Sequence, residues 1–144
     1  MTEPFVALDP DRQLGYLLAR VAAQLERPWS ASLKAKGINP RQFSMLSLLA
    51  RDATISQAEL ARRVLITPQS VSESLVGLED AGLIMRGEIE PGHPARLRLT
   101  ATGRKLLTRA WPEVERTNRE GFAMLTAAER AELSRLLKKV LGAP

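Results

Sequence analysis

Two helix-start signals lie close together in the middle of this chain. At the first, Ser56 is followed by Glu59 at the spacing of a capping box, in which each residue accepts a hydrogen bond from the other's backbone amide. At the second, Thr67 is followed by Pro68, an N-cap residue with proline at the first helical position. Only Leu65-Ile66 separates the first predicted helix from this second signal. The sequence therefore predicts two helices joined by a tight turn.

The second of these helices is predicted to cover residues 68–81 and to end at Gly82, which can adopt the left-handed conformation. Val71, Leu75 and Leu78 recur at helical spacing and form one apolar face. The opposite face is almost free of charge and carries short hydrogen-bonding side chains, which suits a helix that enters the major groove of DNA near its N-terminus. The candidate DNA contacts of this helix are Thr67, Pro68, Gln69, Ser70, Ser72, Glu73 and Ser74.

The stretch that follows predicts a β-hairpin, with strands at residues 83–88 and 95–99 and a turn between them. Apolar and basic residues alternate in the second strand, which turns Leu97 and Leu99 inward and the two arginines outward. A helix-turn-helix followed by a basic hairpin is the outline of a winged-helix DNA-binding domain. The candidate contacts on this wing are Arg86, Arg96 and Arg98, and the alternative for the two strand arginines is simple solvation.

Several short stretches of this block occur together in one order and spacing. They are Gln57-x-x-Leu60-Ala61, Thr67-Pro68-Gln69-Ser70-Val71-Ser72, Leu78-Glu79-x-x-Gly82-Leu83-Ile84, Arg86 and Leu99-Thr100-x-x-Gly103. In these stretches the chain resembles the multiple antibiotic resistance regulator (MarR) family of bacterial and archaeal transcription factors. The resemblance implies a mainly α fold over residues 1–144, with a winged helix-turn-helix at about 39–100 and dimerisation helices at about 9–36 and 101–142.

The resemblance also implies a function. Members act as homodimers that present two recognition helices to a pseudo-palindromic operator in double-stranded DNA, most often as repressors. They respond to small-molecule effectors that bind between the dimerisation helices and the DNA-reading part. Trp29, Phe43 and Trp111 are candidates for lining such an effector pocket, and packing in the core is the alternative.

Two departures from the family pattern bear on DNA binding. The wing tip carries Pro91-Gly92-His93 where many members have Asp-x-Arg, so charged contacts at the tip are not expected. The recognition helix has Glu73 and Gly77 where basic residues are frequent. Glu73 is expected to accept from a cytosine amino group, to orient Arg62 or Arg63, or to face away from the groove.

The flanking segments predict amphipathic helices that need a partner. Apolar residues recur at helical spacing from Leu14 to Leu33 and again from Leu106 to Val114, and prolines within both stripes are expected to kink or break the helices. The Thr126-Ala-Ala-Glu129 capping box starts a last helix. Asn39-Pro40 caps a helix that should brace the DNA-reading helices.

Composition narrows the classes of protein. A length of 144 residues suits one domain, and a net charge of +5 fits a polyanionic partner, although residues 56–105 hold seven basic and six acidic residues. The absence of cysteine excludes disulfides and thiol-based redox sensing. No membrane span and no secretory signal is recognised, so a soluble, cytoplasmic protein is expected.

Catalysis has no support in the sequence. We find no Gly-rich phosphate loop and no nucleophile elbow, and the single histidine, His93, lacks partners for a metal site, so neither a metal nor a cofactor is expected. The alternative function is a winged-helix adaptor or antirepressor that contacts protein without affinity for DNA. Glu73 and Gly77 favour this alternative, whereas Arg96 and Arg98 oppose it.

Overall fold

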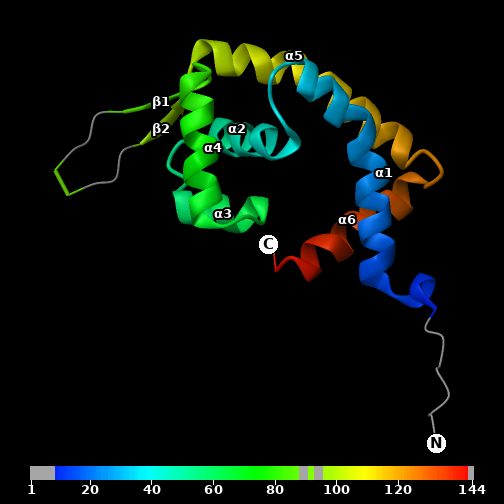
Figure 1. The fold of residues 1–144 in the computed structure, drawn as a ribbon. Coiled ribbons are helices and arrows are strands. Elements are labelled where there is room, and N and C mark those ends of the chain that lie inside the picture. Colours follow the sequence, from blue (N-terminus) through cyan, green and yellow to red (C-terminus); the bar gives the residue numbers. More distant parts are fainter. Residues whose placement is uncertain (1–8, 88–90, 93–95, 143–144) are drawn as a thin grey trace, which may run out of the picture. The chain divides into compact units, whose positions relative to one another are not determined.

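The computed structural model describes residues 9–87, 91–92 and 96–142. Within them the chain is mainly helical and has one two-stranded antiparallel sheet, as the sequence predicted (Figure 1). In chain order the elements are a 3-10 helix η1 (Pro10–Arg12), α1 (Leu14–Ala35), α2 (Pro40–Arg51), α3 (Gln57–Val64), α4 (Pro68–Asp80), β1 (Ile84–Arg86), β2 (Leu97–Leu99), α5 (Ala101–Gly121) and α6 (Ala127–Val140).

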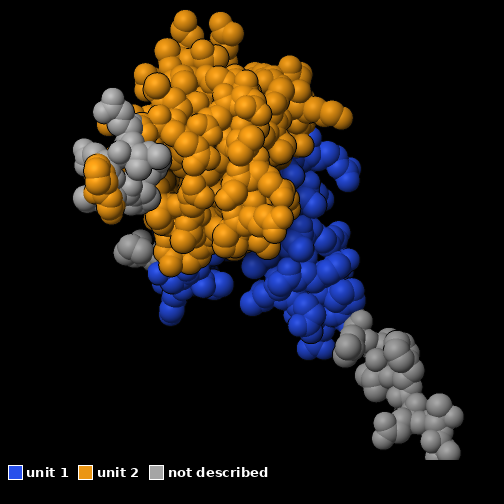
Figure 2. All heavy atoms as spheres, turned by 60° about the vertical axis from the view of Figure 1, so that its left-hand side comes forward, with its two compact units in different colours: residues 1–28, 115–144 blue, residues 29–114 orange. Residues whose placement is uncertain are grey.

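The chain divides into two compact units (Figure 2). One unit comprises residues 29–114, and the other combines residues 1–28 with 115–144. The divisions fall inside α1 and α5, near Pro28 and Pro112. Both prolines lie within continuous helices, so the break that was one of the two alternatives at Pro28 does not occur, and a kink at either proline stays a prediction. Each unit is described separately below.

The unit of residues 29–114 contains the hydrophobic core. Helix α2 packs against α3 and β2, and α4 packs against α3 and β1, so that apolar side chains of all these elements meet. This arrangement confirms the bracing role predicted for α2. The buried apolar residues are Leu33, Ile38, Phe43, Met45, Leu46, Leu49, Leu60, Ala61, Val71, Leu75, Leu78, Leu83, Ile84, Leu97, Leu99, Leu107 and Ala110.

Side-chain caps start the helices where the sequence predicted. Asn39 accepts from the Gln42 amide at 2.9 Å while the Gln42 side chain accepts from the Asn39 amide at 3.0 Å, which completes a capping box. Ser56 accepts from the Glu59 amide at 3.1 Å, but the reciprocal half of the predicted box is not formed. The Glu59 carboxylate pairs with Arg62 and Arg63 instead.

The unit of residues 1–28 and 115–144 has a different character. Within its described residues, 9–28 and 115–142, no apolar side chain is buried. Large apolar side chains are exposed along α1 and from the end of α5 through α6. They are Leu14, Tyr16, Leu17, Leu18, Val21, Met124, Leu136, Val140 and Leu141. Burial of apolar surface drives folding. In a single chain, this unit therefore lacks the buried apolar core that would stabilise it.

Candidate DNA-binding interface

The turn between α3 and α4 has a defined geometry. Helix α3 ends at Leu65 in the left-handed conformation, with φ of 56°, which is uncommon for a residue that is not glycine. The Ile66 amide donates to the carbonyl of Ala61 at 3.1 Å, and Thr67 then caps α4 by accepting from the Ser70 amide at 3.1 Å. Two helices joined by a tight turn are therefore present, as the sequence predicted.

Burial defines the outward face of α4. Val71, Leu75 and Leu78 are at most 1% exposed and mark the inner side of the helix. At the helical spacing of 3.6 residues per turn, the opposite side carries Gln69, Glu73, Val76 and, at the end of the helix, Asp80, and all four are exposed. We call Gln69, Glu73 and Val76 the outward face of α4. Two of them were candidate DNA contacts from the sequence, and the third was not.

The serines of α4 lie on its flanks. Ser70 and Ser74 are only partly exposed, and the Ser70 hydroxyl accepts from the Thr67 hydroxyl at 3.0 Å. Ser72 is exposed and donates to the Gln57 side chain of α3 at 3.4 Å. Thr67 and Pro68, at the start of the helix, are exposed.

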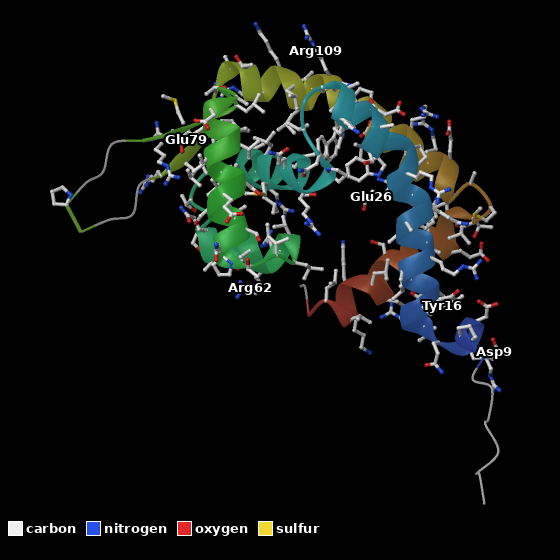
Figure 3. All side chains as sticks on the ribbon, in the orientation of Figure 1. Asp9, Tyr16, Glu26, Arg62, Glu79 and Arg109 are labelled. Carbon is white, nitrogen blue, oxygen red and sulfur yellow. The ribbon has the colours of Figure 1, made fainter. Side chains whose placement is uncertain are left out.

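Glu73 accepts a hydrogen bond from the Gln69 side-chain amide at 3.2 Å. Of the three alternatives expected for Glu73, the structure removes the one in which it orients Arg62 or Arg63, because both arginines pair with Glu59 of their own helix. Figure 3 labels Arg62 on the outer side of α3. The acidic side chain at position 59 lies within reach of both arginines at helical spacing and holds them there.

The wing strands pair antiparallel, with Ile84 opposite Leu99 and Arg86 opposite Leu97. Both strands are shorter than predicted, since β1 covers Ile84–Arg86 and β2 covers Leu97–Leu99. The alternation in β2 is confirmed: Leu97 and Leu99 are buried. Arg96 and Arg98 are exposed. His93 and the rest of 93–95 lie outside the described residues, as do 88–90.

Arg86 differs from the other two wing arginines. Its Nε donates to Glu79 at 2.8 Å, which ties β1 to the last turn of α4, where Figure 3 labels Glu79 beside the strands. Both side chains keep part of their surface in solvent, so the pair adds at most about 1 kcal/mol to stability. The guanidinium of Arg86 is thus partly neutralised within the chain.

The charge of α4 is unusual for a DNA-reading helix. Residues Pro68–Asp80 include Glu73, Glu79 and Asp80 and no basic residue. Phosphate attraction must therefore come from other elements, of which the wing is the best placed, because Arg96, just before β2, and Arg98, within β2, are exposed.

The three aromatic candidates for an effector pocket form one stack. Phe43 is buried, and its ring lies 5.7 Å from that of Trp29 in an edge-on arrangement and 5.9 Å from that of Trp111 in a stacked one. Trp29 is partly exposed, and Trp111 keeps 47% of its surface exposed. The stack thus extends from the core to the surface of the unit of residues 29–114.

A hollow of about 580 Å³ lies in the other unit, between the end of α5 and α6. No feature of the sequence predicted this hollow. Its lining combines apolar side chains with three basic ones, and none of the three aromatic candidates contributes. The lining residues are Asn118, Arg119, Phe122, Ala123, Arg130, Leu133, Ser134, Leu137, Lys138 and Leu141.

The described residues contain no group of three His, Cys, Asp or Glu side chains that could hold a metal ion. No helix among them is both long and apolar enough to cross a membrane.

Val76 is an exposed apolar residue of α4 that was not among the DNA contacts predicted from the sequence. It is 51% exposed, whereas the other large apolar residues of the helix are buried. The signal was present in the sequence, because Val76 falls outside the spacing of Val71, Leu75 and Leu78.

Comparisons with known proteins agree with this architecture. The family model described as MarR family matches residues 36–93. The chain is 38% identical over 136 residues to the HTH-type transcriptional repressor Rv2887 of Mycobacterium tuberculosis, covering 94% of this chain and 98% of that protein.

Two solved structures of the MarR family protein Rv2887 are similar to most of this chain. The complex with DNA is 39% identical and superposes with a TM-score of 0.70, covering 88% of this chain and 96% of that chain. The complex with salicylic acid is 38% identical with a TM-score of 0.71, covering 88% of this chain and 95% of that chain. By its fold, its DNA-reading elements and its similarity over nearly its full length, the chain belongs to the MarR family of transcriptional regulators.

Proposed function

We propose that this chain is a ligand-responsive transcriptional repressor that binds a pseudo-palindromic operator in double-stranded DNA as a homodimer. The observation that carries the proposal is that one winged-helix unit exposes both the outward face of α4 and the wing arginines Arg96 and Arg98. The similar protein Rv2887 is named a repressor, and one of its solved structures is a complex with DNA.

Dimerisation is supported by the apolar side chains exposed on α1 and α6. A monomer would leave them in water, and association with a second copy would bury them. In this proposal, residues of about 39–100 form the DNA-reading part of a single domain. The helices of about 9–36 and 101–142 form the dimerisation part.

The DNA contacts we propose come from two elements. On α4 and its cap they are Thr67, Pro68, Gln69, Ser70, Ser72, Glu73 and Ser74, and on the wing they are Arg86, Arg96 and Arg98. Arg96 and Arg98, the exposed arginines at and within β2, contact phosphates and position the domain, while the outward face of α4 meets base edges.

Regulation follows from a shift between dimer conformers. Only a dimer whose two recognition helices lie about 34 to 36 Å apart fits successive major grooves on one face of DNA. A small molecule that binds better to another conformer lowers the population of the binding form. The similar protein Rv2887 has been solved with salicylic acid and with p-aminosalicylic acid. We propose a small aromatic acid as the effector class, with the Trp29, Phe43 and Trp111 stack as its site.

In this proposal the chain has no catalytic role and needs no cofactor or metal. We place it in the cytoplasm, because such a regulator acts on the chromosome.

The second candidate function is a winged-helix adaptor that contacts protein without affinity for DNA. It is favoured by the acidic character of α4, where three carboxylates stand without a basic residue.

An electrophoretic shift assay separates the two functions. Overlapping duplexes from the DNA that flanks the gene of this protein are titrated beside scrambled duplexes of the same composition. The repressor proposal expects one duplex to shift at far lower protein concentration than its scrambled form, with salicylic acid reversing the shift. Equal, weak shifts for all duplexes would support the adaptor.

A further inference from the structure

The outward face of α4 presents hydrogen-bond acceptors and a methyl-bearing side chain, and no cation. Gln69 and Glu73 are exposed one turn apart, and Val76 follows one turn later on the same side. Val71 and Leu75, on the inner side, are completely buried. The residues of this face therefore do not support the core, and their chemistry is available to whatever contacts the helix.

The hydrogen bond between Gln69 and Glu73 orients both side chains. Because the Gln69 amide nitrogen uses one of its two N–H groups to donate to Glu73 at 3.2 Å, the amide oxygen of Gln69 remains as an acceptor and the second N–H remains as a donor. The Glu73 carboxylate accepts only, and it keeps lone pairs beyond the one that Gln69 uses. The pair therefore offers mainly acceptors, with one N–H donor left on Gln69.

Glu73 also differs from the other glutamates of the two DNA-reading helices. Glu59 pairs with Arg62 and Arg63, and Glu79 pairs with Arg86. In the part of the chain that the structure describes, Glu73 forms no ion pair, and its partner is the neutral side chain of Gln69. The Glu73 carboxylate therefore lies in the middle of the outward face without an ion pair among the described residues.

Base edges in the major groove differ in what they offer such a face. Cytosine and adenine each present an exocyclic amino group, which donates, whereas guanine and thymine present carbonyl oxygens that repel a carboxylate. Thymine also presents a methyl group, which makes favourable contact with an apolar side chain.

We propose that the outward face of α4 is the specificity determinant of this repressor, in which the Gln69–Glu73 pair selects a cytosine or adenine amino group and Val76 selects a neighbouring thymine methyl. The inference rests on the proposed binding of DNA. Val76 lies about 4.5 Å further along the helix axis than Glu73, close to the 3.4 Å separation of successive bases. The thymine is therefore expected within two base steps of the amino-bearing base.

In this arrangement α4 contributes sequence selectivity and little affinity. A carboxylate near the DNA backbone opposes binding to any sequence, and an amino group at the matching base offsets that cost. Specificity then arises because unmatched DNA leaves the carboxylate without a donor. The affinity for phosphate comes from Arg96 and Arg98 of the wing.

The first experiment selects duplexes from a random library with the full-length protein and repeats the selection with Glu73→Gln, Gln69→Ala and Asp80→Asn. Asp80→Asn is the matched control, because it makes the same kind of change at the exposed C-terminal end of the same helix. We expect the unmodified protein to fix cytosine or adenine at one position of each half-site. Glu73→Gln should weaken that preference about tenfold and leave the other positions unchanged. Gln69→Ala should act at the same position, and Asp80→Asn should change none.

The second experiment replaces individual thymines of the selected site by deoxyuridine, which removes only the methyl group. We expect one such replacement per half-site to weaken binding of the unmodified protein about threefold or more, and to have no effect on Val76→Ala. All these side chains are exposed, so circular dichroism should show the same fold for every variant.

The outcomes separate the inference from the function on which it rests. If the unmodified protein enriches no sequence, the proposed function fails and the inference with it. If it enriches a site whose base preferences are the same for Glu73→Gln at every position, the function stands and the inference is overturned. A Glu73-dependent preference for guanine or thymine would overturn it equally.

Discussion

The Thr100 hydroxyl donates a hydrogen bond of 2.6 Å to the carbonyl of Gly82 and accepts one of 3.0 Å from the amide of Gly103. Gly82 follows α4, Thr100 follows β2 and Gly103 lies in the first turn of α5. The Thr100 amide also donates to the Leu83 carbonyl at 3.1 Å. These bonds join the end of the recognition helix, the wing and the start of α5 in one rigid joint.

Gly103 has no room for a side chain at this joint. A Cβ there would lie 2.1 Å from the Leu83 carbonyl oxygen, which is backbone and cannot turn aside. Gly103→Ala should therefore lower the free energy of unfolding by about 1 to 3 kcal/mol, as overpacking does. Gly15→Ala is the control, because a Cβ at Gly15 meets nothing within 4 Å. Urea unfolding of both variants tests this, and equal stability of the two would show that the joint is loose.

Thr100→Val should show that the joint orients the DNA-reading elements as well as stabilising them. The variant keeps the shape of threonine and removes both hydrogen bonds of its hydroxyl, at a cost of about 1 to 3 kcal/mol. Thr100→Ser keeps the hydroxyl and should restore both stability and operator affinity. Operator binding measured below the unfolding transition should weaken in the valine variant only. Full affinity in that variant would limit Thr100 to a role in stability.

Replacing Arg96 and Arg98 by alanine should reduce the salt dependence of DNA binding. If each arginine neutralises one phosphate, the double variant removes about four contacts per dimer, and the slope of log affinity against log salt falls by about 3.6. Fluorescence anisotropy of a labelled duplex at several salt concentrations measures the slope. The control variant, Arg12→Ala with Arg135→Ala, removes the same number of charges from η1 and α6 and should keep the slope. An unchanged slope in the wing variant would make Arg96 and Arg98 ordinary solvated residues.

Charges placed in the apolar stripe of α1 should prevent dimerisation. Leu17→Glu with Val21→Glu puts two carboxylates among side chains that we expect to be buried by the partner, and each buried aliphatic side chain contributes about 1.5 to 3 kcal/mol. Light scattering should then show monomers or unfolded chains where the unmodified protein shows dimers. Glu26→Lys changes a charge on the same helix, labelled in Figure 3, away from the stripe and should leave the dimer intact. A double variant that remains dimeric would contradict this interface.

The order of the helices and the wing could be predicted from the sequence because local chemistry decides it. Caps at Asn39, Thr67 and Thr126 start helices, and Gly82 ends one, whatever the rest of the chain does. The effect of a proline on helix length was harder to predict. Pro28 lies in the middle of α1 without ending it, because a helix can bend around one missing hydrogen bond when its neighbouring turns are held.

The DNA-reading surface was less predictable, because exposure and pairing depend on tertiary structure. The sequence places Glu59 both as a capping residue and at helical spacing from Arg62 and Arg63, and only the structure shows that the ion pairs form and the second half of the capping box does not. The match at Leu99-Thr100-x-x-Gly103 was read as a family resemblance, and its physical basis, the contact of Gly103 with the Leu83 carbonyl, joins residues distant in the chain. Long-range contacts of this kind leave no periodic signal in a sequence.

The capping box of α6 should make stability depend on acid pH. The Thr126 amide donates to the Glu129 carboxylate at 2.7 Å, and this bond, with the one to the Thr126 side chain, holds the pKa of Glu129 below its ordinary value of 4.5. A group whose pKa is lowered by folding stabilises the native state above its unfolded pKa and loses that contribution as the pH falls through the folded value. Glu129→Ala should therefore be less stable than the unmodified protein at neutral pH, and the difference should shrink below about pH 4.5.

Thermal unfolding of both proteins between pH 7 and pH 3 measures this difference. Glu26→Ala, which removes an exposed carboxylate from α1, serves as the comparison and should show no such convergence. A constant gap between Glu129→Ala and the unmodified protein across the whole range would mean that the charge of Glu129 does not support the cap.

Sedimentation velocity of the purified protein with a fluorescent duplex from the DNA flanking its gene tests the central claim most directly. The account predicts that, at moderate salt, the protein alone sediments as a dimer and that the operator duplex binds two chains, while a scrambled duplex of equal length sediments unbound at the same concentration. Identical sedimentation of both duplexes, or a complex with one chain, would contradict it.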